Sequence, residues 1–202
     1  MRYLPILLLF LLNASLLSAQ LTYQWGHRIG DGLREELIEI CPLSNQDFYI
    51  CGGFIDSVAL PGASQHLRGG GWKDILLARY DQNGNKIWSH AFGAQSWDRP
   101  WSMTTDPQDN VYMSGVFSGR VDFDPGSDSS ILQANTRGFW PDGFISKYDP
   151  DGNLLWAKHL LTGRPSGSSP SATLLSITST SVDIYGDLII GGAFFDTVYF
   201  DA

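Results

Sequence analysis

Glutamate is almost absent from this chain of 202 residues, since only Glu35, Glu36 and Glu39 stand among its 21 acidic residues. Aspartate supplies the other acids, and it favours turns because its side chain hydrogen-bonds nearby backbone amides. The chain also carries 22 glycines and 10 prolines, which interrupt helices. The composition therefore argues against a helical fold and favours short strands joined by many turns.

Long apolar runs are absent beyond the N-terminus, and the run found there is short. Arg2 precedes an apolar stretch over Leu4–Leu12, and Ala19 offers a small residue before Gln20. This layout is typical of a cleavable secretory signal peptide, and the run is too short to span a bilayer as a helix. We therefore expect residues 1–19 to be removed and the mature protein to be secreted or displayed at the cell surface, with no membrane insertion.

Positive charge is scarce, with 13 basic residues against 21 acidic ones. Residues 1–19 hold one basic and no acidic residue, so their removal takes the net charge from −8 to −9. An acidic chain does not suit the phosphate backbone, which excludes nucleic acid as a partner.

Recognised catalytic signatures are missing as well. The sequence contains no His-Glu-x-x-His, no Gly-x-Ser-x-Gly and no Gly-x-x-x-x-Gly-Lys. It therefore predicts no catalytic residue and no cofactor.

What the chain does contain is an internal repeat, which predicts its architecture. Ungapped shifts of 63, 68 and 77 residues each bring matching residues together. The matched pairs include Trp25 and Trp88, His27 and His90, Trp72 and Trp140, Asp81 and Asp149, Trp88 and Trp156, and Gly115 and Gly192. Because they repeat, the tryptophans and His27 and His90 favour packing between units over a unique site.

Each unit is predicted to hold four short strands, a to d, bounded by turn residues. The predicted ranges are 37–43, 47–55, 74–80 and 86–92 in the first unit, then 101–105, 111–118, 142–148 and 154–161 in the second, and 188–195 for strand b of the third, whose strand a falls within 175–182. Radial stacking of such sheets buries both of their faces, so we expect an all-β fold of the β-propeller type.

The repeat boundaries divide the mature chain into an incomplete propeller of about two and a half blades. A lone strand d is expected over 20–30, a first blade over 31–93, a second over 94–161 and half of a third over 162–202. The expected partner of this arc is a set of further C-terminal blades.

The stretch from Asp142 to Trp156, DGFISKYDPDGNLLW, resembles the repeat of the seven-bladed β-propeller (SBBP) repeat proteins, and the stretch from Asp74 to Trp88 matches it with Arg79 in place of lysine. The family is bacterial and mostly secreted. The resemblance implies a propeller fold and no shared catalytic motif. Cys51 and the long insertions before Trp72 and Trp140 depart from the repeat.

Ligand binding is expected on the face that carries the long b–c and d–a loops, since long loops on a rigid scaffold commonly hold sites. The first candidates are Trp97, Asp98 and Arg99 in a d–a loop, followed by Arg68, Arg137 and Arg164. The alternative is that these loops are solvated insertions without a ligand.

Two pairs of residues leave alternatives open. Asp122 and Asp124 lie two apart on a strand and form a weak candidate for calcium, although Asp124 recurs as Asp201 and so favours a turn role. Cys41 and Cys51 are expected on adjacent strands, where they form either a disulfide or two buried thiols.

Two classes of function follow from the sequence. The first is a non-catalytic binding or structural module for an unknown protein or glycan ligand. The alternative is a glycan-directed hydrolase or lyase that uses aspartates in the long loops. A propeller scaffold can host either, and the absence of a confident carboxylate pair favours the first.

Overall fold

A computed structural model of the chain describes residues 26, 28–30, 34–61, 66–94, 96–134, 141–162, 175–194 and 198–200. Every regular element within these residues is a β-strand, so the fold is all-β, as the composition predicts. The described part holds no helix able to cross a membrane. The strands are β1 (Glu36–Pro42), β2 (Phe48–Phe54), β3 (Ser57–Val58), β4 (Leu67–Arg68), β5 (Asp74–Tyr80), β6 (Lys86–Phe92), β7 (Arg99–Thr105), β8 (Val111–Phe117), β9 (Arg120–Asp122), β10 (Ile131–Gln133), β11 (Asp142–Tyr148), β12 (Leu154–Thr162), β13 (Leu175–Val182), β14 (Leu188–Phe194) and β15 (Val198–Phe200).

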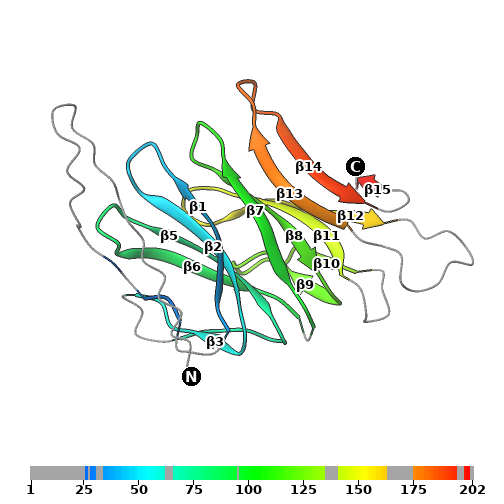
Figure 1. Ribbon diagram of the computed structural model, residues 1–202, viewed down its shortest axis with the longest axis horizontal. Coiled ribbons are helices and arrows are strands. Elements are labelled where there is room, and N and C mark those ends of the chain that lie inside the picture. Colours follow the sequence, from blue (N-terminus) through cyan, green and yellow to red (C-terminus); the bar gives the residue numbers. More distant parts are fainter. Residues whose placement is uncertain are drawn as a thin grey trace, which may run out of the picture.

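Three antiparallel sheets follow one another along the chain and lie side by side (Figure 1). The first sheet has the order β1-β2-β5-β6, the second has β7-β8-β11-β12 with β15 added beside β12, and the third has β13-β14. The predicted four-strand unit is thus confirmed twice. The predicted ranges 74–80, 86–92 and 142–148 match β5, β6 and β11 to the residue.

Aspartate side chains close the tight turns between neighbouring strands. Asp81 and Asp149 each accept hydrogen bonds through Oδ1 from the backbone N–H groups two and four residues later, at 2.8–2.9 Å. Asp106 and Asp183 do the same in the β7–β8 and β13–β14 turns. This chemistry explains why aspartate, rather than glutamate, is the abundant acid, since its shorter side chain reaches its own turn.

A bulge recurs in the first strand of each of the three sheets, and a glycine faces it in all three. The register shifts between Leu37 and Glu39 in β1 and between Pro100 and Ser102 in β7. Opposite these bulges, a Cβ on Gly52 or Gly115 would lie 2.2 Å from the carbonyl oxygen of Glu36 or Arg99. Any larger residue would push the bulged strand away, so glycine is required at both positions.

The main core lies between the first and second sheets. Tyr49, Leu77 and Phe92 from the first sheet pack with Met113 and Tyr148 from the second, and all five are buried. Complete burial of a large apolar side chain contributes about 1.5–3 kcal/mol. A smaller cluster joins the second and third sheets through Ile145, Leu160 and Ile177.

Polar contacts also join the first sheet to the turns of the second. Trp88 Nε1 donates to the carbonyl oxygen of Pro150 at 2.9 Å, and His90 Nε2 lies 3.0 Å from the carbonyl oxygen of Gly152. Tyr49 donates through its hydroxyl to the carbonyl oxygen of Asp109 at 2.9 Å. The packing roles predicted for Trp88 and His90 are therefore confirmed, whereas Trp25 and His27 lie outside the described residues.

Two small hairpins that the sequence does not predict occupy the connections between the second and third strands of each four-stranded sheet. β3 pairs with β4 in the first connection, and β9 pairs with β10 in the second. Strands of two or three residues carry no detectable periodicity, which is why the sequence indicates only loops here.

The chain just after strand b bonds to the strand that precedes its own sheet, and this clasp occurs twice. In β15, Tyr199 pairs with Leu161 of β12. At the equivalent repeat positions, Gly30 donates its N–H to the carbonyl oxygen of Ala59 at 2.9 Å. Arg28 to Gly30 are not themselves in a strand, and the rest of the predicted lone strand lies mostly outside the described residues.

Candidate functional site at the long-connection end

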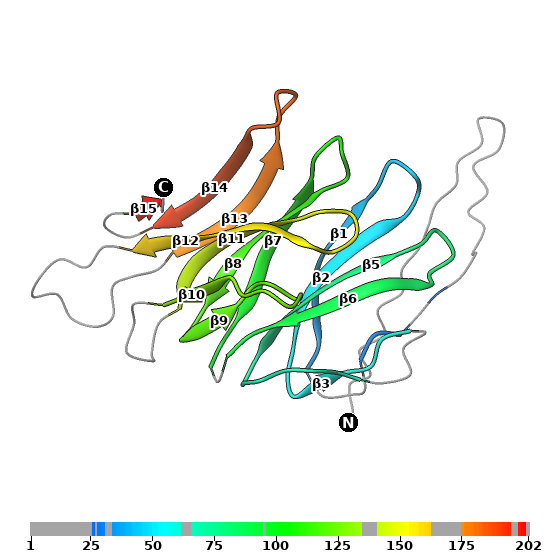
Figure 2. The same ribbon diagram turned by 180° about the vertical axis from the view of Figure 1, so that it is seen from behind.

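The long connections between strands gather at one end of the sheets. Figure 1 shows the β1–β2, β7–β8 and β13–β14 turns at one end and β3 and β9 at the other, and Figure 2 shows the same arrangement from behind. We call the end that carries β3 and β9 the long-connection end. Its described residues are 55–61 and 66–73 between β2 and β5, 93–94 and 96–98 between β6 and β7, and 118–134 and 141 between β8 and β11.

A backbone junction fixes two of these connections against each other. Trp72 donates its N–H to the carbonyl oxygen of Ser96 at 3.1 Å, and Asp98 donates its N–H to that of Lys73 at 2.8 Å. Lys73 and Trp97 form a parallel β-bridge between these bonds. The segment that carries the predicted ligand residues is thus held by a rigid neighbour.

Two tryptophans stand exposed at this junction. Trp97, a predicted ligand residue, is 50% exposed, and Trp72 is 82% exposed. A tryptophan exposed to this extent is unusual because burial of its ring is favourable. The sequence gives no ligand role to Trp72, because its match with Trp140 favours packing. The three glycines Gly69–Gly71 just before Trp72 were the one sequence feature that pointed to an unusual backbone conformation at this position.

Asp98 is an anchor of the junction and not an exposed ligand residue. Its side chain is fully buried. Oδ2 accepts from the N–H of Ala94 at 2.8 Å, and Oδ1 accepts from the N–H of Ser118 at 2.7 Å. Its pKa is raised to about 6, chiefly by burial and also by the nearby Asp74, against the lowering effect of these two bonds.

The side chain of Arg99 is also held by an interaction within the protein. It is the first residue of β7 and not part of the loop, because the bulge at Pro100 lets the strand begin two residues earlier than predicted. Its guanidinium forms an ion pair with Glu36, which also pairs with Lys73. Burial would raise the pKa of Glu36, but the two cations hold it below its usual value.

Equivalent buried aspartates begin β5 and β11, and their surroundings differ. Asp142 Oδ2 lies 3.0 Å from His159 Nε2. Asp74 has no such histidine beside it; its Oδ2 accepts from the N–H of Gly71 at 3.2 Å, and its Oδ1 is buried without a hydrogen-bond partner. Desolvation raises the pKa of Asp74. These carboxylates lie beneath the surface and cannot contact a bulky substrate.

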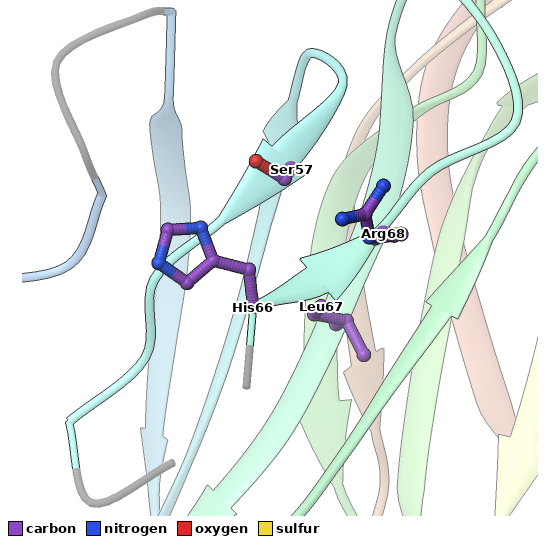
Figure 3. A pocket seen from close by; sticks show the side chains of 4 residues that line it. All are labelled: Ser57, His66, Leu67 and Arg68. Carbon is purple, nitrogen blue, oxygen red and sulfur yellow. The ribbon is translucent and has the colours of Figure 1, made fainter. Parts of the chain in front are cut away.

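Arg68 lines an open hollow beside the junction. The hollow is formed by Ser57 of β3 and by His66, Leu67 and Arg68 of the facing segment. Figure 3 shows the imidazole of His66 beside the start of β4 and the guanidinium of Arg68 at its end, with Leu67 between them. Arg68 is exposed, so of the two predicted arginines that the structure describes, Arg68 rather than Arg99 is available to an anionic group.

Arg137 and Arg164 lie outside the described residues. Asp122 and Asp124 serve a turn: Oδ1 of Asp122 accepts from the N–H groups of Asp124 and Ser130 at 3.1 and 2.8 Å, and Oδ1 of Asp124 accepts from that of Gly126 at 2.8 Å.

Cys41 and Cys51 are free thiols in this structure. Cys41 pairs in register with Tyr49, so Cys51 is its diagonal neighbour on the same face. Burial raises the pKa of Cys41 to about 12 and raises that of Cys51 as well.

Comparison with known proteins gives no family for the chain: no protein-family model matches it, and no curated protein is detectably similar.

Proposed function

We propose that the protein is a secreted β-propeller of the SBBP repeat type that acts as a non-catalytic binding or structural module, with its ligand bound at the long-connection end. Three consecutive antiparallel sheets, each with a bulge in its first strand, support the propeller architecture, because each sheet leaves a face for the next one to cover. The predicted signal peptide supports export.

The observation that carries the binding function is the exposed pair Trp72 and Trp97. Their backbones are joined by the junction, so a ligand would meet rings whose loops are already ordered. Preorganisation of this kind lowers the entropic cost of binding. Tryptophan suits the apolar faces of sugar rings as well as protein surfaces.

A glycan hydrolase or lyase is the second candidate, favoured by the raised pKa of Asp98, since general acids often have raised pKa values. The burial of Asp98 and its two backbone hydrogen bonds oppose a role in contact with substrate. We therefore prefer the binding module.

The test is a screen of the mature protein against soluble glycans and cell-surface polymers, followed by single substitutions. Trp72→Ala and Trp97→Ala should each weaken binding by about ten-fold or more, as expected for central interface tryptophans. Tyr185→Ala is the matched control, because Tyr185 is an 83% exposed aromatic on the opposite end. Loss of binding in Tyr185→Ala alone would place the site at the end opposite the long-connection end and would overturn the proposal. Release of new reducing ends from a glycan would favour the hydrolase.

Export has a separate test. The mature protein recovered from a secreting host should begin at Gln20, as determined by N-terminal sequencing.

A further inference from the structure

The outer edge of β14 has no strand beside it among the described residues, where β14 pairs with β13 alone. The equivalent strands β2 and β8 are paired on both edges and buried along their whole length. On β14, by contrast, Ile189 is 56% exposed. An unpaired edge with exposed apolar side chains is a template for another strand.

The first two sheets show in which register such a strand would lie. β5 pairs with β2 so that Asp74 faces Phe54 and Tyr80 faces Phe48. β11 pairs with β8 in the same way, from Asp142 opposite Phe117 to Tyr148 opposite Val111. Leu188–Phe194 of β14 occupies the corresponding repeat positions and has the same length of seven residues. The free edge therefore fits a strand that begins with aspartate opposite Phe194 and has tyrosine as its seventh residue opposite Leu188.

An ion pair fixes the sixth residue of both incoming strands. Arg79 of β5 bonds Asp47 Oδ2 at 2.8 Å, and Lys147 of β11 lies 3.0 Å from Asp106 Oδ2. Asp47 ends the β1–β2 turn, whereas Asp106 begins the β7–β8 turn. Each turn thus supplies one acid at a different position.

The β13–β14 turn has acids at both of these positions. Asp183 begins the turn and matches Asp106, and Asp187 ends it and matches Asp47. Asp183 uses Oδ1 to hold its own turn, as Asp106 does, and in Asp106 the other oxygen, Oδ2, contacts the lysine while also accepting from Asn110 Nδ2. Asp187 is exposed. The edge thus offers a doubly acidic site where the sixth residue of an added strand would lie.

We propose that the free edge of β14 is an acceptor site for an antiparallel β-hairpin whose first strand carries aspartate first, a cation sixth and tyrosine seventh. Added strands of this kind gain affinity from backbone hydrogen bonds and specificity from alternate side chains. A second copy of this chain is not the proposed occupant, because β5 and β11 already have partners on both edges.

The test uses a synthetic peptide with the sequence of residues 74–92, which spans β5 and β6 and carries the cation, Arg79, whose partner Asp47 matches Asp187. Hydrogen exchange of the intact protein is measured residue by residue with and without the peptide. We expect slower exchange of β14 amides, confined to alternate residues that face the free edge, and no added protection in β2 or β8.

The charge requirement is tested by a double-mutant cycle. A peptide carrying Arg79→Glu should bind about five-fold more weakly, which is the scale of a partly exposed ion pair. The protein variant Asp187→Lys should weaken the unmodified peptide to a similar degree and restore binding of the altered one. Asp128→Lys, a charge reversal at an exposed acid of the Asp122–Ser130 turn, is the matched control and should change neither.

Three results would overturn the proposal: unchanged exchange in β14, binding insensitive to the charge swap, or protection of β14 that rises with protein concentration in the absence of peptide. The last would assign the edge to a second copy. Trp72→Ala and Trp97→Ala should leave hairpin binding intact, so this test is independent of the ligand proposed for the long-connection end.

Discussion

The buried carboxyl of Asp98 predicts an unusual dependence of stability on pH. Its pKa rises from an ordinary value of 3.8 to about 6 in the folded protein, chiefly because burial penalises the charged form. The folded state therefore binds the proton more tightly than the unfolded state does. Stability from this group is fully present below pH 4 and is lost as the pH rises to about 6.

The size of the effect follows from the shift. Two pKa units correspond to about 3 kcal/mol, and the side chain is fully buried, so solvent screening does not reduce this greatly. Other groups add their own dependence on pH: desolvation raises the pKa of Asp74 and lowers that of His90. For this reason the difference between wild type and Asp98→Asn isolates the contribution of Asp98.

The assay is urea unfolding followed by tryptophan fluorescence at several pH values between about 4 and 7. The wild type should lose about 3 kcal/mol more of its unfolding free energy across this range than Asp98→Asn does. Asp128→Asn removes one charge at an exposed position and should follow the wild type. Parallel curves for all three proteins would refute the assignment of Asp98 as a buried, desolvated acid.

Two further predictions concern packing. Gly152→Ala should destabilise the protein by at least about 1 kcal/mol more than Gly186→Ala does. Both glycines have positive φ, but of the two only Gly152 has neighbours that a Cβ would meet, the nearest being His90 Nε2 at 2.7 Å. Equal losses of stability in thermal or urea unfolding would contradict this. Cys41 and Cys51 should both titrate as thiols in denatured, unreduced protein and should react slowly in the folded protein. Diagonal neighbours lie about 7–8 Å apart between Cα atoms, which is beyond the usual range of a disulfide. The absence of titratable thiols would show that a bridge forms.

Much of the strand pattern could be predicted from the sequence because the same signals recur. The aspartate that begins β5 and β11, the Tyr-Asp pair that ends them and the Gly-Asn turn that follows fix three strand ranges exactly. Repetition separates these signals from chance, since each position is seen twice. The small hairpins of β3, β4, β9 and β10 are too short to show any period.

The candidate site was predicted less well, for a reason visible in Trp97, Asp98 and Arg99. The three are consecutive, yet their surroundings differ. Trp97 is half exposed, and Asp98 is buried against backbone amides. Arg99 lies in a strand, and its guanidinium forms an ion pair with Glu36. Their different fates depend on Lys73, Ser118 and Glu36, which are distant in sequence. A local pattern does not contain these partners.

The clasp formed by Gly30 with Ala59, and again by Leu161 with Tyr199, also sets where the chain can be divided into interchangeable modules. At these two places the chain that follows a sheet's second strand bonds the segment that precedes that sheet, so a cut just before the sheet would sever a hydrogen-bonded connection. A duplicated or exchanged unit would keep its bonds only if its ends fell inside a sheet, between strands b and c. The unit that evolution or engineering could exchange in this protein is thus shifted by half a sheet relative to the sheets of the fold.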